Sequence, residues 1–251
     1  MESAVASQLI ELNRQFYTRF GDSFSATRHR IQPGVRRVIE SLRGDEDILD
    51  LGCGNGWFAR ELAKHGHRGS YLGVDFSLPL LRDAESQPSF VSSQDEGFSA
   101  AFRQGDLTAL ESATFNLQPS TFDLVTAFAV LHHIPSVDIR LDILKTVRQL
   151  LKPNGLFIHS NWQFLNSEKL KSRIQDWSKA GLSPDDVDPN DYLLDWRSGG
   201  KGLRYVHHFD KDELQELSEA VGFQIKDVFY SDGETWDLGL YQVWSINPLV
   251  E

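Results

Sequence analysis

The residue types best suited to chemistry in this chain stand in one glycine-rich run, Asp50-Leu51-Gly52-Cys53-Gly54-Asn55-Gly56. An apolar lead at Ile48 and Leu49 comes before the run, and a helical pattern begins near Asn55. Glycine has no Cβ and tolerates positive φ, so glycines at alternate positions of a strand-to-helix turn let the backbone approach a ligand closely. The first N–H groups of the helix lack partners within it and suit a polar or anionic group. The run therefore predicts a site for a nucleotide-like ligand.

An acidic residue stands where such a ligand would present its ribose. Asp75 ends the next apolar strand, Tyr71-Leu72-Gly73-Val74-Asp75, and a ribose-binding acid is expected about twenty residues after the glycines. A carboxylate accepts two hydroxyl hydrogen bonds well, and any adenosyl ribose offers a diol. Gly54, Gly56 and Ala59 also fit the G-x-G-x-x-A dinucleotide fingerprint, so NAD stays open at this point. The alternative interpretation is that no ligand binds here: the glycine run is then only a tight turn, and Asp75 is a solvated residue at a strand end.

Three later segments continue the alternation of apolar strands and helical patterns. They are Gly105-Asp106-Leu107 after a short strand at 100–103, a buried strand at 122–128 that leads into His132-His133, and Leu150-Leu151-Lys152-Pro153-Asn154-Gly155 before a strand at 156–160. In this order, with Asp50 before the first glycine, the segments resemble the class I S-adenosylmethionine-dependent methyltransferases over residues 45–160. The combination selects S-adenosyl-L-methionine over NAD, which the glycine run alone does not.

The resemblance implies an α/β fold with a Rossmann-like seven-stranded sheet whose last strand is reversed. The cofactor-binding residues that it implies are Asp50, Gly52, Cys53, Gly54, Asn55, Gly56, Asp75, Phe76, Asp106, Leu107 and Phe128. Asp75 would hold the ribose hydroxyls, and Asp106 would accept from the adenine amino group beside the N–H of Leu107. Asp50 would order the turn and the amino-acid end of the cofactor. We interpret Cys53 as a small buried filler rather than a nucleophile.

Segments outside the core are similar to one subfamily, the wobble-uridine tRNA carboxymethyl methyltransferases, which includes a domain fused to an AlkB-type oxygenase. These segments are Phe24-Ser25-Ala26-Thr27-Arg28, Trp162, Asp195-Trp196, and Arg204-Tyr205-Val206-His207 followed by Phe209 and Glu213-Leu214. The subfamily usually has two aromatic residues where this chain has Tyr205-Val206, and proline where it has Asp195. The departures bear on the substrate more than on the chemistry.

Methyl transfer is an in-line displacement, so the protein mainly has to position the acceptor and exclude water. A carboxylate acceptor needs no base, whereas a hydroxyl or an amine would benefit from a histidine. The candidates near the acceptor are His207, from the subfamily-like run, and His132, which follows the fourth strand; for each, a lining or structural role is the alternative. Arg28 is the third candidate, because a guanidinium can hold a carboxylate or phosphate in a fork.

The composition of the 251-residue chain limits which classes of substrate, metal and partner we expect. Its net charge of −11 opposes tRNA binding by the chain alone, since phosphate neutralisation dominates nucleic-acid affinity. It therefore favours either an activating protein partner or a smaller acceptor. The single Cys excludes an internal disulfide, and the histidines lack metal-ligand spacing, so we expect no metal. Without an apolar run of about 20 residues or a signal pattern, we expect a cytoplasmic protein and no membrane segment.

The resemblance implies one methyltransferase domain over residues 1–251, which the periodicity divides into four parts. Residues 1–44 form a helical lid, with a helix at 4–20 that Gly21 stops and a second helix that begins at Pro33. Residues 45–161 form the cofactor-binding core, and residues 162–209 form a substrate cap that contains a helix at 167–179. Residues 210–251 form a helix and a hairpin that turns at Asp232-Gly233.

Three functions follow from these observations. The first is methylation of tRNA at a modified wobble-uridine carboxylate, which the cap and N-terminal likeness favour. The second is methylation of a small molecule, which the acidic charge favours. The third is a non-catalytic subunit that binds the cofactor and acts through a catalytic partner.

Overall fold

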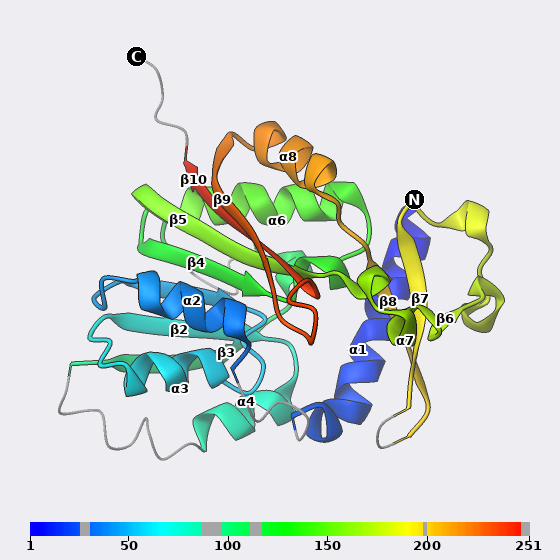
Figure 1. Cartoon of the computed structure of the whole chain (residues 1–251), viewed down its shortest axis with the longest axis horizontal. Helices are drawn as coiled ribbons and strands as arrows, with labels where there is room; N and C mark the ends of the chain where they lie inside the picture. Colours follow the sequence, from blue (N-terminus) through cyan, green and yellow to red (C-terminus); the bar gives the residue numbers. More distant parts are fainter. Residues whose placement is uncertain (26–30, 87–96, 111–116, 198–199, 247–251) are drawn as a thin grey trace.

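A seven-stranded sheet in the order β3-β2-β1-β4-β5-β10-β9 forms the centre of the computed structural model, which describes residues 1–25, 31–86, 97–110, 117–197 and 200–246 (Figure 1). The strands are β1 (Ile48–Leu51), β2 (Ser70–Asp75), β3 (Ser99–Gln104), β4 (Phe122–Phe128), β5 (Leu151–Trp162), β9 (Phe223–Ser231) and β10 (Gly239–Ile246). Strands β1 to β5 pair in parallel, whereas β10 runs antiparallel to both β5 and β9. The predicted Rossmann-like sheet with a reversed last strand is confirmed.

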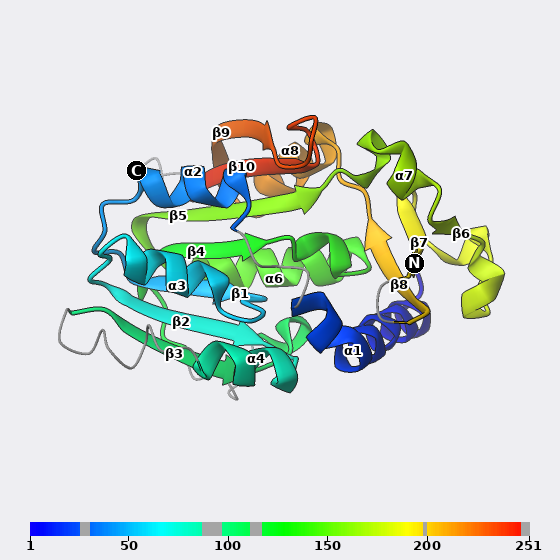
Figure 2. The same cartoon turned by 60° about the horizontal axis from the view of Figure 1, so that its bottom comes forward.

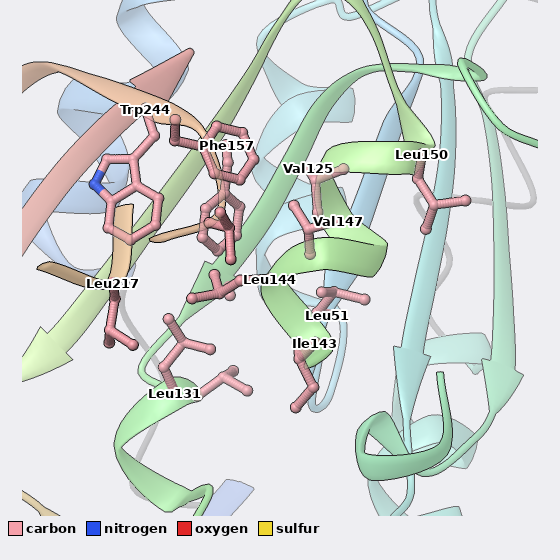
Figure 3. Packing of buried hydrophobic residues seen from close by; sticks show 14 of the residues in the cluster. Leu51, Val125, Leu131, Ile143, Leu144, Val147, Leu150, Phe157, Leu217 and Trp244 are labelled. Atoms are coloured by element: carbon pink, nitrogen blue, oxygen red, sulfur yellow. The ribbon is translucent and has the colours of Figure 1, made fainter. Parts of the chain in front are cut away.

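Helices cover both faces of this sheet and create two separate hydrophobic cores. One core packs α2 (Pro33–Ser41), α3 (Trp57–Lys64) and α4 (Leu78–Glu85) against the sheet. The other packs α6 (Val137–Leu150) and α8 (Lys211–Ala220) against it, and Figure 3 shows Leu144 and Val147 of α6 in this core with Val125 of β4. Side chains alternate across a strand, so β1 sends Leu49 to one core and Ile48 to the other. A continuous apolar run is typical of such doubly covered parallel strands.

A small antiparallel sheet and the long helix α1 (Ser3–Ser25) lie beyond the carboxyl ends of β4 and β5 (Figures 1 and 2). The small sheet contains β6 (Ile174–Gln175), β7 (Asp191–Trp196) and β8 (Gly202–His207), and α1 packs on β8. Short helical turns join the strands: η4 (Phe164–Asn166), α7 (Glu168–Lys171), η5 (Trp177–Ala180) and η6 (Pro184–Asp186). None of the helices in the described part of the chain combines the length and apolar character that a membrane crossing requires.

Two predicted helices differ from the structure. The helix at 167–179 is wrong, because only Glu168–Lys171 is α-helical and Ile174 then pairs with Leu194 of β7. Tertiary pairing with β7 therefore overrides a local helical pattern. The first helix does not stop at Gly21 but continues to Ser25. A Cβ added at Gly21 would lie 3.6 Å from the hydroxyl oxygen of Ser77, an ordinary contact distance, so packing does not require a glycine there.

Candidate active site

The glycine turn between β1 and α3 adopts left-handed backbone at all three of its glycines. Gly52, Gly54 and Gly56 have φ angles of 69°, 56° and 73°. A Cβ on Gly52 would lie 2.5 Å from a methyl of Val130, and one on Gly56 would lie 2.9 Å from the Cβ of Ala84. A Cβ on Gly54 would meet nothing within 4 Å, so it would project into open space. Packing and positive φ thus both favour glycine at positions 52 and 56, whereas at Gly54 the positive φ alone does so and the space beside it is open.

Asp75 ties the end of β2 to this turn. One of its carboxylate oxygens accepts from the N–H of Gly54 at 2.9 Å, and the other accepts from the N–H of Ser77 at 2.8 Å. Burial raises the pKa of Asp75, and the N–H groups of Ser77 and Gly54 oppose that rise. Each carboxylate oxygen can accept more than one hydrogen bond. Asp75 therefore fixes the shape of the turn and keeps acceptor capacity for a ribose diol.

Asp50 lies buried below the turn and is held by two hydroxyl groups. Tyr71 donates to one oxygen at 2.6 Å, and Thr126 donates to the other at 2.7 Å. Burial raises the pKa of Asp50 to about 6, and the two hydroxyl donors only partly offset this effect. The contacts fit the predicted role of Asp50 in ordering the turn.

The raised pKa of Asp50 gives a pH-dependent stability that Asp50→Asn should remove. Because the folded-state pKa of about 6 exceeds the unfolded value, the contribution of Asp50 favours folding below about pH 4 and is lost as pH rises through about 6. Between about pH 4 and pH 7, the unfolding free energy of the wild type should fall relative to that of Asp50→Asn by up to about 3 kcal/mol. Urea titrations of both proteins across this range measure the difference, and a constant difference would refute the assignment.

A cavity of about 220 Å³ opens at the carboxyl ends of the central strands, and the predicted cofactor residues gather around it. The lining includes the predicted residues Asp50, Gly52, Cys53, Gly54, Asn55, Asp75, Phe76, Asp106, Leu107 and Phe128. Of the predicted set, only Gly56 is absent from this lining. Burial raises the pKa of the Cys53 thiol, which fits a filler better than a nucleophile. The open space at Gly54 and the acids at two strand ends fit an adenosyl ligand.

Helix α1 supplies a wall of this cavity that the sequence did not reveal in detail. Ile10, Asn13, Arg14 and Tyr17 line the cavity. Arg14 forms a 2.5 Å ion pair with Asp106, whose other oxygen accepts from the N–H of Thr108 at 2.9 Å. The signal in the sequence was the spacing of these residues on one helical face.

The two adjacent histidines of the turn η3 (Leu131–His133) have different surroundings. His132 is buried, accepts from the N–H of Trp162 at 3.2 Å, and does not line the cavity. His133 does line it, and its Nε2 lies 2.8 Å from the Tyr17 hydroxyl. Because its Nδ1 faces the Tyr205 carbonyl at 3.2 Å, Nδ1 must donate, and Nε2 of the neutral ring accepts from Tyr17. The cavity-facing histidine is therefore His133, the neighbour of the predicted catalytic candidate His132.

The second predicted histidine belongs to a buried polar cluster of α6, β7, β8 and α8. His207 places Nδ1 2.7 Å from Asp191 and Nε2 2.9 Å from Glu213. Arg140 is 2% exposed, forms an ion pair with Glu213 at 3.2 Å, and donates to the Tyr205 hydroxyl at 3.0 Å. None of these residues lines the cavity. Their contacts join the cap to the core.

Arg28 lies outside the described residues. Within the described ranges, no cluster of three or more His, Cys, Asp or Glu side chains is arranged to hold a metal ion.

The sheet order and the glycine turn define a Rossmann-like enzyme fold. The family described as "Methyltransferase domain" matches residues 24–228. The chain belongs to this family and is an enzyme of the methyltransferase class.

Three curated relatives illustrate the range of similarity. A protein of Encephalitozoon cuniculi, named as a candidate methyltransferase, is 30% identical over 85% of this chain and 87% of its own length. The ubiquinone biosynthesis O-methyltransferase of Methylococcus capsulatus is 32% identical over 53% of this chain and 52% of its own length. The tRNA (carboxymethyluridine(34)-5-O)-methyltransferase of Mus musculus is 24% identical over 59% of this chain. The match spans only 19% of that mouse protein.

Solved structures share the fold. An S-adenosylmethionine-dependent methyltransferase from Methanosarcina mazei has a TM-score of 0.65 at 25% identity, over 86% of this chain and 98% of its own. The protein DhpI, solved in complex with S-adenosylmethionine, has a TM-score of 0.64 at 18% identity, over 94% of this chain and 97% of its own. The family match and these structures support S-adenosyl-L-methionine as the cofactor.

Proposed function

We propose that this enzyme transfers a methyl group from S-adenosyl-L-methionine to tRNA, at the carboxylate of a modified wobble uridine. The observation that carries the proposal is the meeting of three subfamily-like segments at one place. The guanidinium carbon of Arg204 lies 4.8 Å from the ring centre of Trp162 and 5.6 Å from that of Trp196. The partial similarity to the mouse enzyme, whose name states this tRNA methylation, also supports the proposal.

In this proposal, separate residues of the chain bind the cofactor and surround the methyl acceptor. Gly54, Asp75 and Asp106 would hold the cofactor, which when bound supplies a methyl group on a sulfonium. Tyr17 and Arg14 on α1 cover the same cavity and would exclude water from it. A carboxylate acceptor is already ionised, so His133 would orient groups at the cavity without having to remove a proton.

The three predicted catalytic residues remain proposals with different placements. Burial of His132 and His207 away from the cavity lining favours supporting roles, in the η3 turn and in the cap cluster. Arg28, which lies outside the described residues, is proposed to hold a carboxylate or phosphate of the acceptor. An activating protein partner belongs to the proposal, because a chain of net charge −11 has little general attraction for phosphate.

The test uses purified protein, methyl-labelled S-adenosylmethionine and bulk tRNA from cells that lack this protein. We expect label in a methylated wobble nucleoside, identified by mass spectrometry, and activity that falls steeply as salt rises. Parallel reactions with cell extract supply any protein partner. The proposal fails if tRNA stays unlabelled in both reactions.

The second candidate function is methylation of a small molecule, which the net charge and the similarity to a ubiquinone biosynthesis O-methyltransferase favour. In that case label would enter a low-molecular-weight filtrate of the extract, and the activity would be insensitive to salt. Binding of the cofactor without transfer to either fraction would instead support a non-catalytic subunit.

A further inference from the structure

Arg204 of β8 is a buried arginine that has no anionic partner among the side chains that the structure describes. Its side chain is 6% exposed and lies among Phe16, Trp162 and Trp196, with ring centres 4.8–5.6 Å from the guanidinium carbon. Among the described residues, no carboxylate forms an ion pair with it, and its Nε has no hydrogen-bond partner. Arg140 offers the contrast inside the same chain, since it is buried but faces Glu213 and Asp191.

A buried guanidinium with no counter-charge is costly for the fold. Transfer from water penalises the charge, and burial correspondingly lowers the pKa of Arg204. Aromatic faces compensate in part through cation–π attraction. Arg173 adds a repulsive charge nearby. The planar fork of donors is suited to a carboxylate, which would supply the missing charge and accept two hydrogen bonds.

The position of Arg204 connects it to the cofactor cavity. Arg204 hydrogen bonds to the hydroxyl of Tyr17, and that hydroxyl lies 2.8 Å from Nε2 of His133. Both Tyr17 and His133 line the cavity, so the guanidinium is one side chain away from it. Trp162 stands at the carboxyl end of β5 and is partly exposed, which gives this region a side toward solvent.

We propose that Arg204 is the acceptor-binding residue of the enzyme and that it receives the carboxylate to be methylated, with Trp162 and Trp196 flanking the acceptor. The inference rests on the proposed methyl transfer and names the residue that binds its acceptor group. One carboxylate oxygen forms a bond to the methyl carbon while the bond between that carbon and sulfur breaks. The electron pair of the broken bond stays on sulfur. The anionic acceptor and the cationic donor become a neutral ester and a neutral thioether, and no proton moves.

A purely structural role for Arg204 predicts the opposite effect on stability. If Arg204 only supports the aromatic cluster, Arg204→Met should lower the melting temperature. If it is kept for an anion, Met should fill the same space without a buried charge, and the melting temperature should hold or rise. Arg37→Met is the control, because Arg37 is an exposed arginine that also lies over an aromatic ring, that of Phe229, far from the cap.

The binding test follows tryptophan fluorescence, because Trp162 and Trp196 flank the guanidinium. Sodium acetate and the nucleoside 5-carboxymethyluridine are titrated into the protein saturated with S-adenosylhomocysteine. We expect a saturable signal with 5-carboxymethyluridine that weakens about 100-fold in Arg204→Met and stays unchanged in Arg37→Met. Equal titrations in all three proteins, or a melting temperature lowered in Arg204→Met alone, would overturn the proposal.

A product test separates this inference from the proposed tRNA substrate. Methyl esters are cleaved by mild alkali and release labelled methanol, whereas methyl ethers and methylamines are stable. Alkali-labile label in tRNA supports both proposals, and alkali-stable label in tRNA overturns only the inference. Alkali-labile label confined to small molecules upholds the inference and overturns the tRNA substrate. If no fraction is labelled, the fluorescence and melting data decide alone.

Discussion

Asp75→Ala is expected to weaken the binding of S-adenosylhomocysteine by about 2–4 kcal/mol, the largest effect on cofactor affinity that the site predicts. The change removes two charge-assisted acceptors for the ribose diol. It also leaves the N–H groups of Gly54 and Ser77 without the carboxylate that holds the turn. Isothermal titration calorimetry measures the affinity directly.

The control for this prediction is Asp142→Ala on α6. Asp142 is exposed and pairs with Lys145 one turn away, so its loss should leave cofactor affinity unchanged. Circular dichroism establishes that both variants are folded. A folded Asp75→Ala protein with wild-type affinity would show that the ribose contact lies elsewhere.

Arg140→Ala is expected to lower the free energy of unfolding by about 3–5 kcal/mol, the largest stability effect where the cap joins the core. The substitution leaves the buried carboxylate of Asp191 and the partly buried carboxylate of Glu213 without their arginine partner. It also removes the donor to the carbonyl of Ile134 at 2.9 Å. Urea denaturation followed by fluorescence measures the loss.

Arg37→Ala is the matched control for this stability test. Arg37 is exposed and pairs with Asp227 at 3.1 Å, so its removal should change the unfolding free energy by less than about 1 kcal/mol. A similarly small effect for Arg140→Ala would mean that the cluster around His207 does not hold the cap to the core.

The central sheet could be predicted from the sequence because its signals are local. Apolar runs such as Phe122–Phe128 identify buried strands, and the glycine turn marks where β1 gives way to α3. The side chains at strand ends then meet at one edge of a parallel sheet, which places Asp50, Asp75 and Asp106 around a common cavity. The cofactor side of the site follows from these rules.

The acceptor side could not be predicted in the same way, because long-range contacts decide it. The pairing of Ile174 with Leu194 turns an expected helix into a strand. His132 and His133 are adjacent in the sequence, and only the turn that carries them determines which ring faces the cavity. Arg14 gains its role from Asp106, which is 92 residues away. Such contacts leave no periodic signal in a single sequence.

Calorimetry with S-adenosylhomocysteine and with NAD, on the same protein preparation, tests the central claim most directly. We predict one-to-one binding of S-adenosylhomocysteine and no measurable binding of NAD, because the family is a methyltransferase family and we propose that Gly54, Asp75 and Asp106, which line the cavity, hold the adenosyl group. Arg204→Met should keep this affinity, and Asp75→Ala should lose it. Tight binding of NAD without binding of S-adenosylhomocysteine would contradict the account.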